Sequence, residues 1–121
     1  MTRKMFLAAL AVFTTSLFAA DTKPKTVIHV ITVKWNADAK PAQIEQALKA
    51  AEALPSEYPG ITHVWTKPIK KQIPDDYSTV IVMEFSSEDA LKKYADSPAQ
   101  KKFYESYMPI RDESRTSDIT N

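Results

Sequence analysis

Two histidines lie within short apolar runs of this 121-residue chain and are its first candidates for chemistry. His29 lies in VIHVITVKW and His63 lies in ITHVW. An imidazole in an enclosed, partly dry cavity can take up or release a proton near neutral pH. A buried neutral histidine that is hydrogen-bonded to a backbone or tyrosine group is the simpler interpretation. His29 is therefore a candidate general base, with a structural role as the alternative.

Aromatic side chains form a second set of candidates, because they can line a pocket for a flat or hydrophobic ligand. Aromatic residues also dominate protein cores and subunit interfaces, so a structural role is the simpler interpretation here as well. The candidates for such a pocket are Trp35, Trp65, Tyr77 and Tyr94, with His63 beside Trp65.

The sequence contains no motif for a metal, a cofactor or a phosphate group. The two histidines could share a metal only with a third ligand, and no spacing supplies one. The single glycine, Gly60, excludes a glycine-rich phosphate loop. Asp75–Asp76 and Glu88–Asp89 are sequence neighbours, which indicates a turn and a helix start rather than a catalytic carboxylate pair. We therefore expect neither a metal nor a cofactor.

The elements that must position these residues begin with two apolar runs, Val27 to Trp35 and Tyr77 to Phe85. Alternate side chains of a strand point to opposite faces, and both runs are largely apolar on both faces. A sheet with one solvated face would instead alternate apolar and polar residues. A chain this short cannot cover both faces, so we expect a partner subunit, or alternatively a monomer with an apolar pocket on one face. In the first run, His29 shares its face with Ile31, Val33 and Trp35.

A helix and a second strand are predicted between these two runs. Pro41 suits the first turn of a helix, which Pro55 to Gly60 is expected to end. The apolar residues of this segment recur at helical spacing: Ile44, Ala47, Leu48, Ala51 and Leu54. The stretch from Ile61 to about Lys67 alternates like a strand, with Ile61, His63 and Trp65 on one face.

Serines indicate two helix starts after the last apolar run, at Ser86 to Asp89 and at Ser97–Pro98. A weak last strand is predicted near Ser114 to Thr120. The order is then strand, helix, strand, strand, helix, strand. This order predicts an α+β fold, a ferredoxin-like split βαβ unit with a four-stranded antiparallel sheet.

Residues 1 to 20 have the pattern of a secretory signal peptide. Arg3 and Lys4 precede an apolar stretch from Met5 to Phe18, and Ala19 or Ala20 suits cleavage. A retained N-terminal anchor is the alternative, although the stretch is short for a membrane span. The chain has no cysteine, which excludes a lipoprotein anchor and disulfides. We expect a secreted or periplasmic protein with no stable membrane anchor, a polar lead-in at residues 21–26 and one domain at residues 27–121.

The charge balance does not favour a nucleic-acid partner. The chain has 16 basic and 15 acidic residues, and removal of Arg3 and Lys4 with the signal segment leaves 14 against 15. A near-neutral domain lacks the positive field that nucleic-acid binding needs. Lys67, Lys70 and Lys71 form a local cluster, which is typical of a protected strand edge.

Several segments of residues 27–121 also match a known family. They are the strand-borne histidine and following lysine in VIHVITVKW, the turn YPGI, the run YSTVIVMEFSSEDALKKYADSPAQKKF and the terminal SDIT. The chain from about Val27 to Asn121 therefore resembles the stress-responsive dimeric α/β barrel (Dabb) family. The resemblance implies two ferredoxin-like subunits that pack their sheets into one barrel.

The resemblance also implies site residues. Plant polyketide cyclases of this family use a tyrosine and a histidine in a barrel cavity for an aldol-type condensation. Tyr94 matches that tyrosine, and His29 matches the family's first-strand histidine. The family's His-Pro-x-His motif reads SPAQ here, with Ser97 and Gln100 in place of the histidines. Glutamine cannot exchange a proton near neutral pH, which speaks against the cyclase mechanism.

Three functions remain open at this point. The first is an exported stress-response barrel that forms a homodimer, binds a small hydrophobic or aromatic ligand and has no catalytic activity. The alternative is a cofactor-independent, cyclase- or monooxygenase-like enzyme acting on an aromatic or polyketide-like molecule, with His29 as base and Tyr94 as proton donor. A third is an exported interaction module that binds another protein. No set of acid, base and nucleophile converges in the sequence, which favours the first.

Overall fold

The computed structural model describes residues 25–68 and 77–121. The predicted signal peptide, most of the predicted lead-in, Lys70, Lys71 and the pair Asp75–Asp76 lie outside the described residues.

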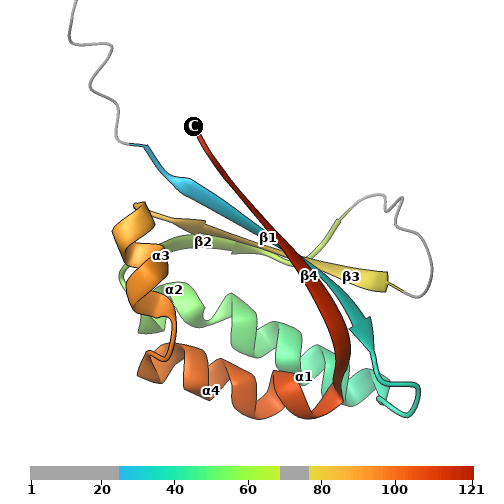
Figure 1. Cartoon of the computed structure of the whole chain (residues 1–121). Helices are drawn as coiled ribbons and strands as arrows, with labels where there is room; N and C mark the ends of the chain where they lie inside the picture. Colours follow the sequence, from blue (N-terminus) through green and yellow to red (C-terminus); the bar gives the residue numbers. More distant parts are fainter. Residues whose placement is uncertain (1–24, 69–76) are drawn as a thin grey trace, which may run out of the picture.

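The described chain forms one four-stranded sheet and four α-helices (Figure 1). In chain order they are β1 (Val27–Trp35), α1 (Pro41–Glu52), α2 (Leu54–Glu57), β2 (Ile61–Trp65), β3 (Tyr77–Phe85), α3 (Glu88–Tyr94), α4 (Pro98–Tyr107), the 3-10 turn η2 (Met108–Ile110) and β4 (Arg111–Thr120). The strand order in the sheet is β2-β3-β1-β4, and every neighbouring pair is antiparallel. The predicted α+β fold with a four-stranded antiparallel sheet is confirmed.

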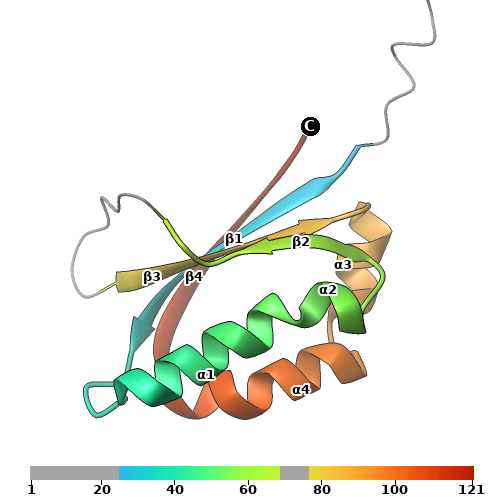
Figure 2. The same ribbon diagram turned by 180° about the vertical axis from the view of Figure 1, so that it is seen from behind.

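The alternating strand pattern places the core on the face that the helices cover. On β3 the residues Ile81, Met83 and Phe85 are fully buried, and on β1 Val33 is as well. These side chains pack against the inward faces of α1 and α4, which supply Ala47, Ala51, Phe103 and Tyr107. Figures 1 and 2 show α1 and α4 side by side under the sheet, with no helix on its opposite face. That opposite surface is called the open face below.

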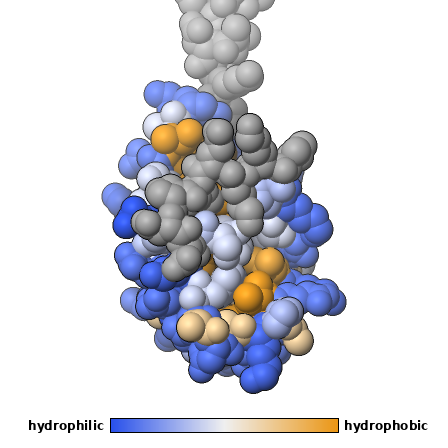
Figure 3. Space-filling model, turned by 90° about the vertical axis from the view of Figure 1, so that its right-hand side faces the viewer, coloured by the Kyte–Doolittle hydropathy of each residue, from blue (hydrophilic) through white to orange (hydrophobic). Residues whose placement is uncertain are grey.

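The open face carries apolar side chains that the described chain only partly covers. Val30 of β1 lies opposite Val82 of β3, and both are partly exposed. At the sheet edges, Trp65 of β2 is 49% exposed and Ile119 of β4 is 63% exposed. At the end of the molecule nearest the β1–α1 turn, hydrophilic residues predominate and hydrophobic side chains form only small groups (Figure 3).

Serine caps set the start of both helices that follow β3. The Ser87 hydroxyl accepts a hydrogen bond from the Ala90 N–H at 3.0 Å, and the Ser97 hydroxyl accepts one from the Gln100 N–H at 3.1 Å. Each cap satisfies a backbone donor that the first helical turn leaves free. Asp96 joins the two helices with a φ of 64°, a left-handed conformation in which aspartate is tolerated. The two predicted helix starts are thus confirmed.

Three local predictions are wrong in detail. Pro55 does not end the first helix but lies in the first turn of α2. The missing N–H of a proline costs nothing there, because N–H groups of the first turn have no acceptor within the helix. The last strand begins at Arg111 rather than near Ser114. In β2, a bulge between Ile61 and His63 reverses the expected alternation, so that Ile61 is buried while His63 and Trp65 lie on the open face.

No helix in residues 25–68 and 77–121 is both long enough and apolar enough to span a membrane.

Candidate functional site

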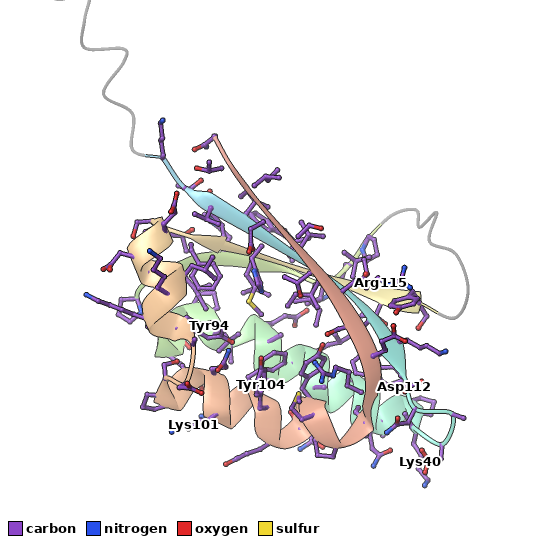
Figure 4. All side chains as sticks on the ribbon, viewed as in Figure 1. Lys40, Tyr94, Lys101, Tyr104, Asp112 and Arg115 are labelled. Atoms are coloured by element: carbon purple, nitrogen blue, oxygen red, sulfur yellow. The ribbon has the colours of Figure 1, made fainter. Side chains whose placement is uncertain are left out.

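A cavity of about 340 Å³ lies between the sheet and the helices α3 and α4. This volume is within the usual range of small-molecule sites, which are concave and mostly apolar with a few polar groups. Strands β1, β3 and β4 form its roof, and α3 and α4 form its floor. In Figure 4 the labelled Tyr94 and Tyr104 lie between these helices and the strands. Its apolar lining includes Ile31, Met83, Leu91 and Phe103.

His29 and Asp118 form a hydrogen-bonded pair at one end of the cavity. They face each other across β1 and β4, and Nδ1 of His29 lies 2.5 Å from Oδ1 of Asp118. A carboxylate only accepts hydrogen bonds, so Nδ1 carries a proton, and in the neutral ring the lone pair is then on Nε2. The ring also packs edge-on against Phe85, with centroids 5.8 Å apart. The pair therefore fixes the tautomer that a general base requires.

Tyr94 lies at the same end of the cavity. Its ring packs against Phe85, with centroids 5.3 Å apart, and only 4% of the residue is exposed. Its hydroxyl is buried and forms no hydrogen bond with any described group. Burial raises the pKa of Tyr94 well above its ordinary value, and the neighbouring Tyr104 and Tyr107 raise it further. The hydroxyl is therefore a neutral donor without an acceptor, which is costly unless a ligand or water supplies one.

Arg111 and Tyr107 form a second polar group at the other end of the cavity. The Arg111 guanidinium lies 5.7 Å from the centroid of the Tyr107 ring, and its Nη1 donates a hydrogen bond to the Ser114 hydroxyl at 3.1 Å. Burial raises the pKa of Tyr107, although nearby Ser114 and Arg111 partly offset this effect. Ser114 pairs with Val33 and Asp118 pairs with His29, four positions apart along each strand. At about 3.3 Å per residue, the backbone positions of Ser114 and Asp118 are roughly 13 Å apart along β4.

Gln100 also lines the cavity, but its side chain already forms two hydrogen bonds within the protein. Its Oε1 accepts a hydrogen bond from the Asp96 N–H at 2.8 Å, and its Nε2 donates to the Tyr104 hydroxyl at 3.3 Å. These contacts hold the link between α3 and α4. In this structure Gln100 is therefore a residue that positions the cavity wall.

The remaining predicted pocket residues lie elsewhere. Trp35 is on the helix-covered side, where its Nε1–H donates to the Thr79 hydroxyl at 2.7 Å. Tyr77 lies under the Arg115 guanidinium, 4.7 Å from its ring centroid. His63 and Trp65 stack on the open face with centroids 5.2 Å apart. The structure thus brings His29, Tyr94 and Gln100 together and leaves Trp35, Tyr77, His63 and Trp65 outside the cavity lining.

Sequence reasoning missed Asp118, Arg111 and Ser114, all on β4. The strand is polar except for Ile119 near its end, so its alternation carries no hydrophobic signal. These residues could have been found only from the pairing register of β4 with β1. An antiparallel partner of the first strand must place one residue opposite His29.

Within the described parts of the chain, no three histidine or acidic side chains gather as metal ligands. His29 and His63 lie on opposite faces of the sheet, each beside its own carboxylate.

Solved structures with the same fold differ widely in what their names state. A dimeric ferredoxin-like protein of unknown function from Thermobifida fusca is 19% identical, with a TM-score of 0.68, covering 82% of this chain and 93% of that one. A hydroxynitrile lyase from Passiflora edulis is 14% identical, with a TM-score of 0.71 and coverage of 82% and 95%. SnoaB, a cofactor-independent oxygenase from Streptomyces nogalater, is 18% identical, with a TM-score of 0.57 and coverage of 80% and 91%. These likenesses establish the fold.

No curated protein sequence matches the chain. The model of the stress responsive A/B barrel domain matches residues 27–121, which is most of the chain. The chain therefore belongs to the stress responsive A/B barrel domain (Dabb) family.

Proposed function

We propose that this protein is a small-molecule-binding member of its family, and that its ligand occupies the cavity between the sheet and the helices α3 and α4. The observation that carries the proposal is the hydroxyl of Tyr94, which is buried at the cavity without a hydrogen-bond partner among the described groups. A phenylalanine would fill the same space without the cost of an unpaired buried donor. A ligand oxygen that accepts this hydrogen bond accounts for the tyrosine.

The chemistry of the cavity defines the class of ligand. Its apolar middle suits a flat or aromatic body, and its polar ends suit one or two oxygen atoms. We therefore expect a small aromatic molecule that bears a hydroxyl, carbonyl or similar acceptor.

Methionine-methyl NMR tests this proposal directly. Met83 is fully buried and lines the cavity, whereas Met108 is 39% exposed and lies outside it. In protein carrying ¹³C-methyl methionine, titration with 2-naphthol is expected to shift the Met83 resonance and leave Met108 in place. Binding that shifts only Met108, or no shift at millimolar probe, would contradict the proposal.

Cofactor-independent proton transfer is a second candidate function, favoured by the His29–Asp118 pair. Nε2 of His29 takes a proton from a carbon next to a carbonyl, the C–H electron pair forms an enolate, and the Tyr94 hydroxyl donates a hydrogen bond to its oxygen. The imidazolium formed is stabilised by Asp118 at 2.5 Å and returns a proton to carbon. The hydroxynitrile lyase and oxygenase among the structural neighbours support an enzymatic role in this fold without defining one.

Hydrogen–deuterium exchange of α-tetralone in D₂O tests this second function. The protein is expected to accelerate exchange at the carbon next to the carbonyl. His29→Ala is expected to lower the rate by about a hundredfold, the usual contribution of a general base. His63→Ala is the matched control, because His63 also contacts a carboxylate but lies on the open face. Exchange no faster than in buffer would leave ligand binding as the function.

We also propose that the molecule assembles as a homodimer through the open face. Val30, Val82, Trp65 and Ile119 are apolar and incompletely covered there, and removal of apolar surface from water stabilises an interface by about 25 cal/mol per Å². A two-fold dimer is the commonest closed assembly. The dimeric ferredoxin-like neighbour from Thermobifida fusca supports this arrangement.

Export to the periplasm or the extracellular space is proposed from residues 1–20 alone. The basic start at Arg3 and Lys4 and the apolar stretch that follows are typical of a cleaved signal peptide. Intact-mass measurement of the protein from a secreting host is expected to show a chain that begins at Ala20 or Asp21. A full-length chain that stays with the membrane fraction would indicate a retained anchor instead.

A further inference from the structure

The cavity contains more hydrogen-bond donors than the described protein groups can satisfy. The Nε of Arg111 and the hydroxyls of Tyr94 and Tyr107 are buried, and none of these atoms forms a hydrogen bond of good geometry with a described residue. The Tyr107 hydroxyl nevertheless lies near the side chains of Ser114 and Arg111, which lower its pKa, so the Tyr94 hydroxyl and the Arg111 Nε are the clearer unpaired donors. All three residues line the same cavity. The guanidinium is a permanently charged donor with no acceptor, whereas a tyrosine hydroxyl can both donate and accept. The unpaired Arg111 Nε and Tyr94 hydroxyl call for a ligand that offers acceptors.

Arg111 also lacks a carboxylate partner in the described structure. Seven ion pairs are formed by the described residues, and none of them includes Arg111. Its sequence neighbour Asp112 pairs instead with Lys34, at 3.8 Å. The contacts of Arg111 are the Ser114 hydroxyl and the face of Tyr107, both of which leave its positive charge uncompensated. A buried guanidinium edge with no anion is costly, and a bound carboxylate removes that cost.

We propose that the ligand of this cavity is a carboxylate, whose anionic end is bound by Arg111 and whose other end reaches His29 and Tyr94. The inference rests on the proposed function of the cavity and adds the charge and direction of its ligand. The planar guanidinium presents paired donors that match a carboxylate, which a lysine could not do equally well. Asp118, the carboxylate in the cavity lining, lies at the opposite end and is held by His29, so it does not repel an anion at Arg111.

The separation of the two ends sets the shape of the ligand. Roughly 13 Å lies between the Ser114 and Asp118 positions along β4, measured at about 3.3 Å per residue. The segment between them is lined by Ile31, Met83 and Phe103. We therefore assign the ligand to the class of flat aromatic acids with a second oxygen at the far end of the ring system.

The test compares 6-hydroxy-2-naphthoate with its neutral primary amide, which has nearly the same shape. Calorimetric titration of the full protein is expected to show tighter binding of the acid by about tenfold to a hundredfold, the usual range for a charge-assisted hydrogen bond. Arg111→Met is expected to remove this preference, so that the acid and the amide bind with similar affinity. Arg115→Met is the matched control, because Arg115 lies on the same strand but stacks on Tyr77 outside the cavity.

The outcomes separate this inference from the proposed function. If the amide shifts Met83 and binds as tightly as the acid, the cavity binds small molecules and the anionic preference is wrong. If neither probe shifts Met83, both statements are wrong. The comparison of acid and amide in the unaltered protein decides the question even if Arg111→Met fails to fold. In that case Arg111→Lys, which keeps the charge but loses the paired donors, is expected to bind the acid more weakly than the unaltered protein does.

Discussion

His29 and His63 lie on opposite faces of one sheet, and each contacts a carboxylate. Nδ1 of His29 is 2.5 Å from Asp118, and Nδ1 of His63 is 2.8 Å from Glu84. The two pairs have the same chemistry, but the His29 side chain is 17% exposed and the His63 side chain is 61% exposed. His29 lines the cavity, whereas His63 stacks on Trp65. Only His29 combines the acid–base pair with a ligand-sized space.

Replacement of the two histidines is therefore expected to have unequal effects on binding. His29→Ala removes a polar group that faces the ligand, and a lost hydrogen bond weakens affinity by about fivefold to tenfold. His63→Ala is expected to leave affinity unchanged. Calorimetric titration with 2-naphthol checks both variants. An equal loss in both would show that the effect is indirect and would remove His29 from the site.

Tyr94→Phe is expected to separate function from stability. The Tyr94 hydroxyl has no partner among the described residues, so its removal relieves an unpaired buried donor. The free energy of unfolding at pH 7 is expected to stay the same or to rise by about 1 kcal/mol, while affinity for 2-naphthol falls. Urea unfolding and titration of the same samples provide the two readouts. A stability loss of about 2 kcal/mol or more would indicate that the hydroxyl has a structural partner instead.

Alkaline pH is expected to destabilise the protein through Tyr94. Burial raises the pKa of Tyr94 in the folded chain, whereas in the unfolded chain it ionises near its ordinary value of about 10. Above that pH the unfolded chain loses the proton and the folded chain keeps it, so stability falls as pH rises. The slope from this one group approaches about 1.4 kcal/mol per pH unit.

Urea unfolding from pH 9 to pH 11.5 measures this slope. Other tyrosines also titrate in this range, and burial raises the pKa of Tyr107 as well. The difference between the unaltered protein and Tyr94→Phe isolates the contribution of Tyr94. Parallel curves for the two proteins would show that Tyr94 titrates as freely in the folded chain as in the unfolded one.

Val82→Asp is expected to break the proposed dimer without unfolding the subunit. Val82 lies on the open face and is partly exposed within a single chain, so a carboxylate there can stay hydrated in the monomer. In a packed interface the same charge would be buried without a partner, at a cost of several kcal/mol. Light scattering is expected to give twice the chain mass for the unaltered protein and the single mass for the variant.

Gln46→Asp provides the control for this experiment, since it adds the same charge at an exposed position of α1. It is expected to remain dimeric. A monomeric unaltered protein at micromolar concentration would contradict the proposed assembly.

The sequence predicted most of the fold because its local signals agree with one another. The apolar runs of β1 and β3 give strands, and Ser87 and Ser97 mark the two helices that follow. Strict alternation also puts His29 on the same face as the core residues Ile31 and Val33, where the structure has it. Family resemblance added a proton-donor role for Tyr94, which was otherwise only one of several aromatic pocket candidates.

The face on which His63 and Trp65 lie and the cavity residues of β4 could not be predicted, because both depend on how the strands pair. The bulge at Thr62 inserts one extra residue into β2 and so moves His63 and Trp65 to the open face. The sequence ITHVW contains no residue that predicts a bulge there. Asp118 and Arg111 lie in a polar strand, where only the pairing register identifies which side chains face inward. Of the candidate residues named from the sequence, His29, Tyr94 and Gln100 line the cavity, whereas its lining residues on β4 were not among the candidates.

Strand β4 serves both surfaces of the sheet. Ser114 and Asp118 line the cavity, while Arg115 and Ile119 occupy the alternate positions that pair with open-face residues of β1. For the proposed ligand and the proposed dimer, a shift of this one strand would change both the space in the cavity and the fit of the partner subunit. Ligand binding and assembly are thermodynamically linked where ligand affinity differs between monomer and dimer, and such a coupling is reciprocal. Ligand affinity is then expected to depend on protein concentration, and the dimer dissociation constant on ligand.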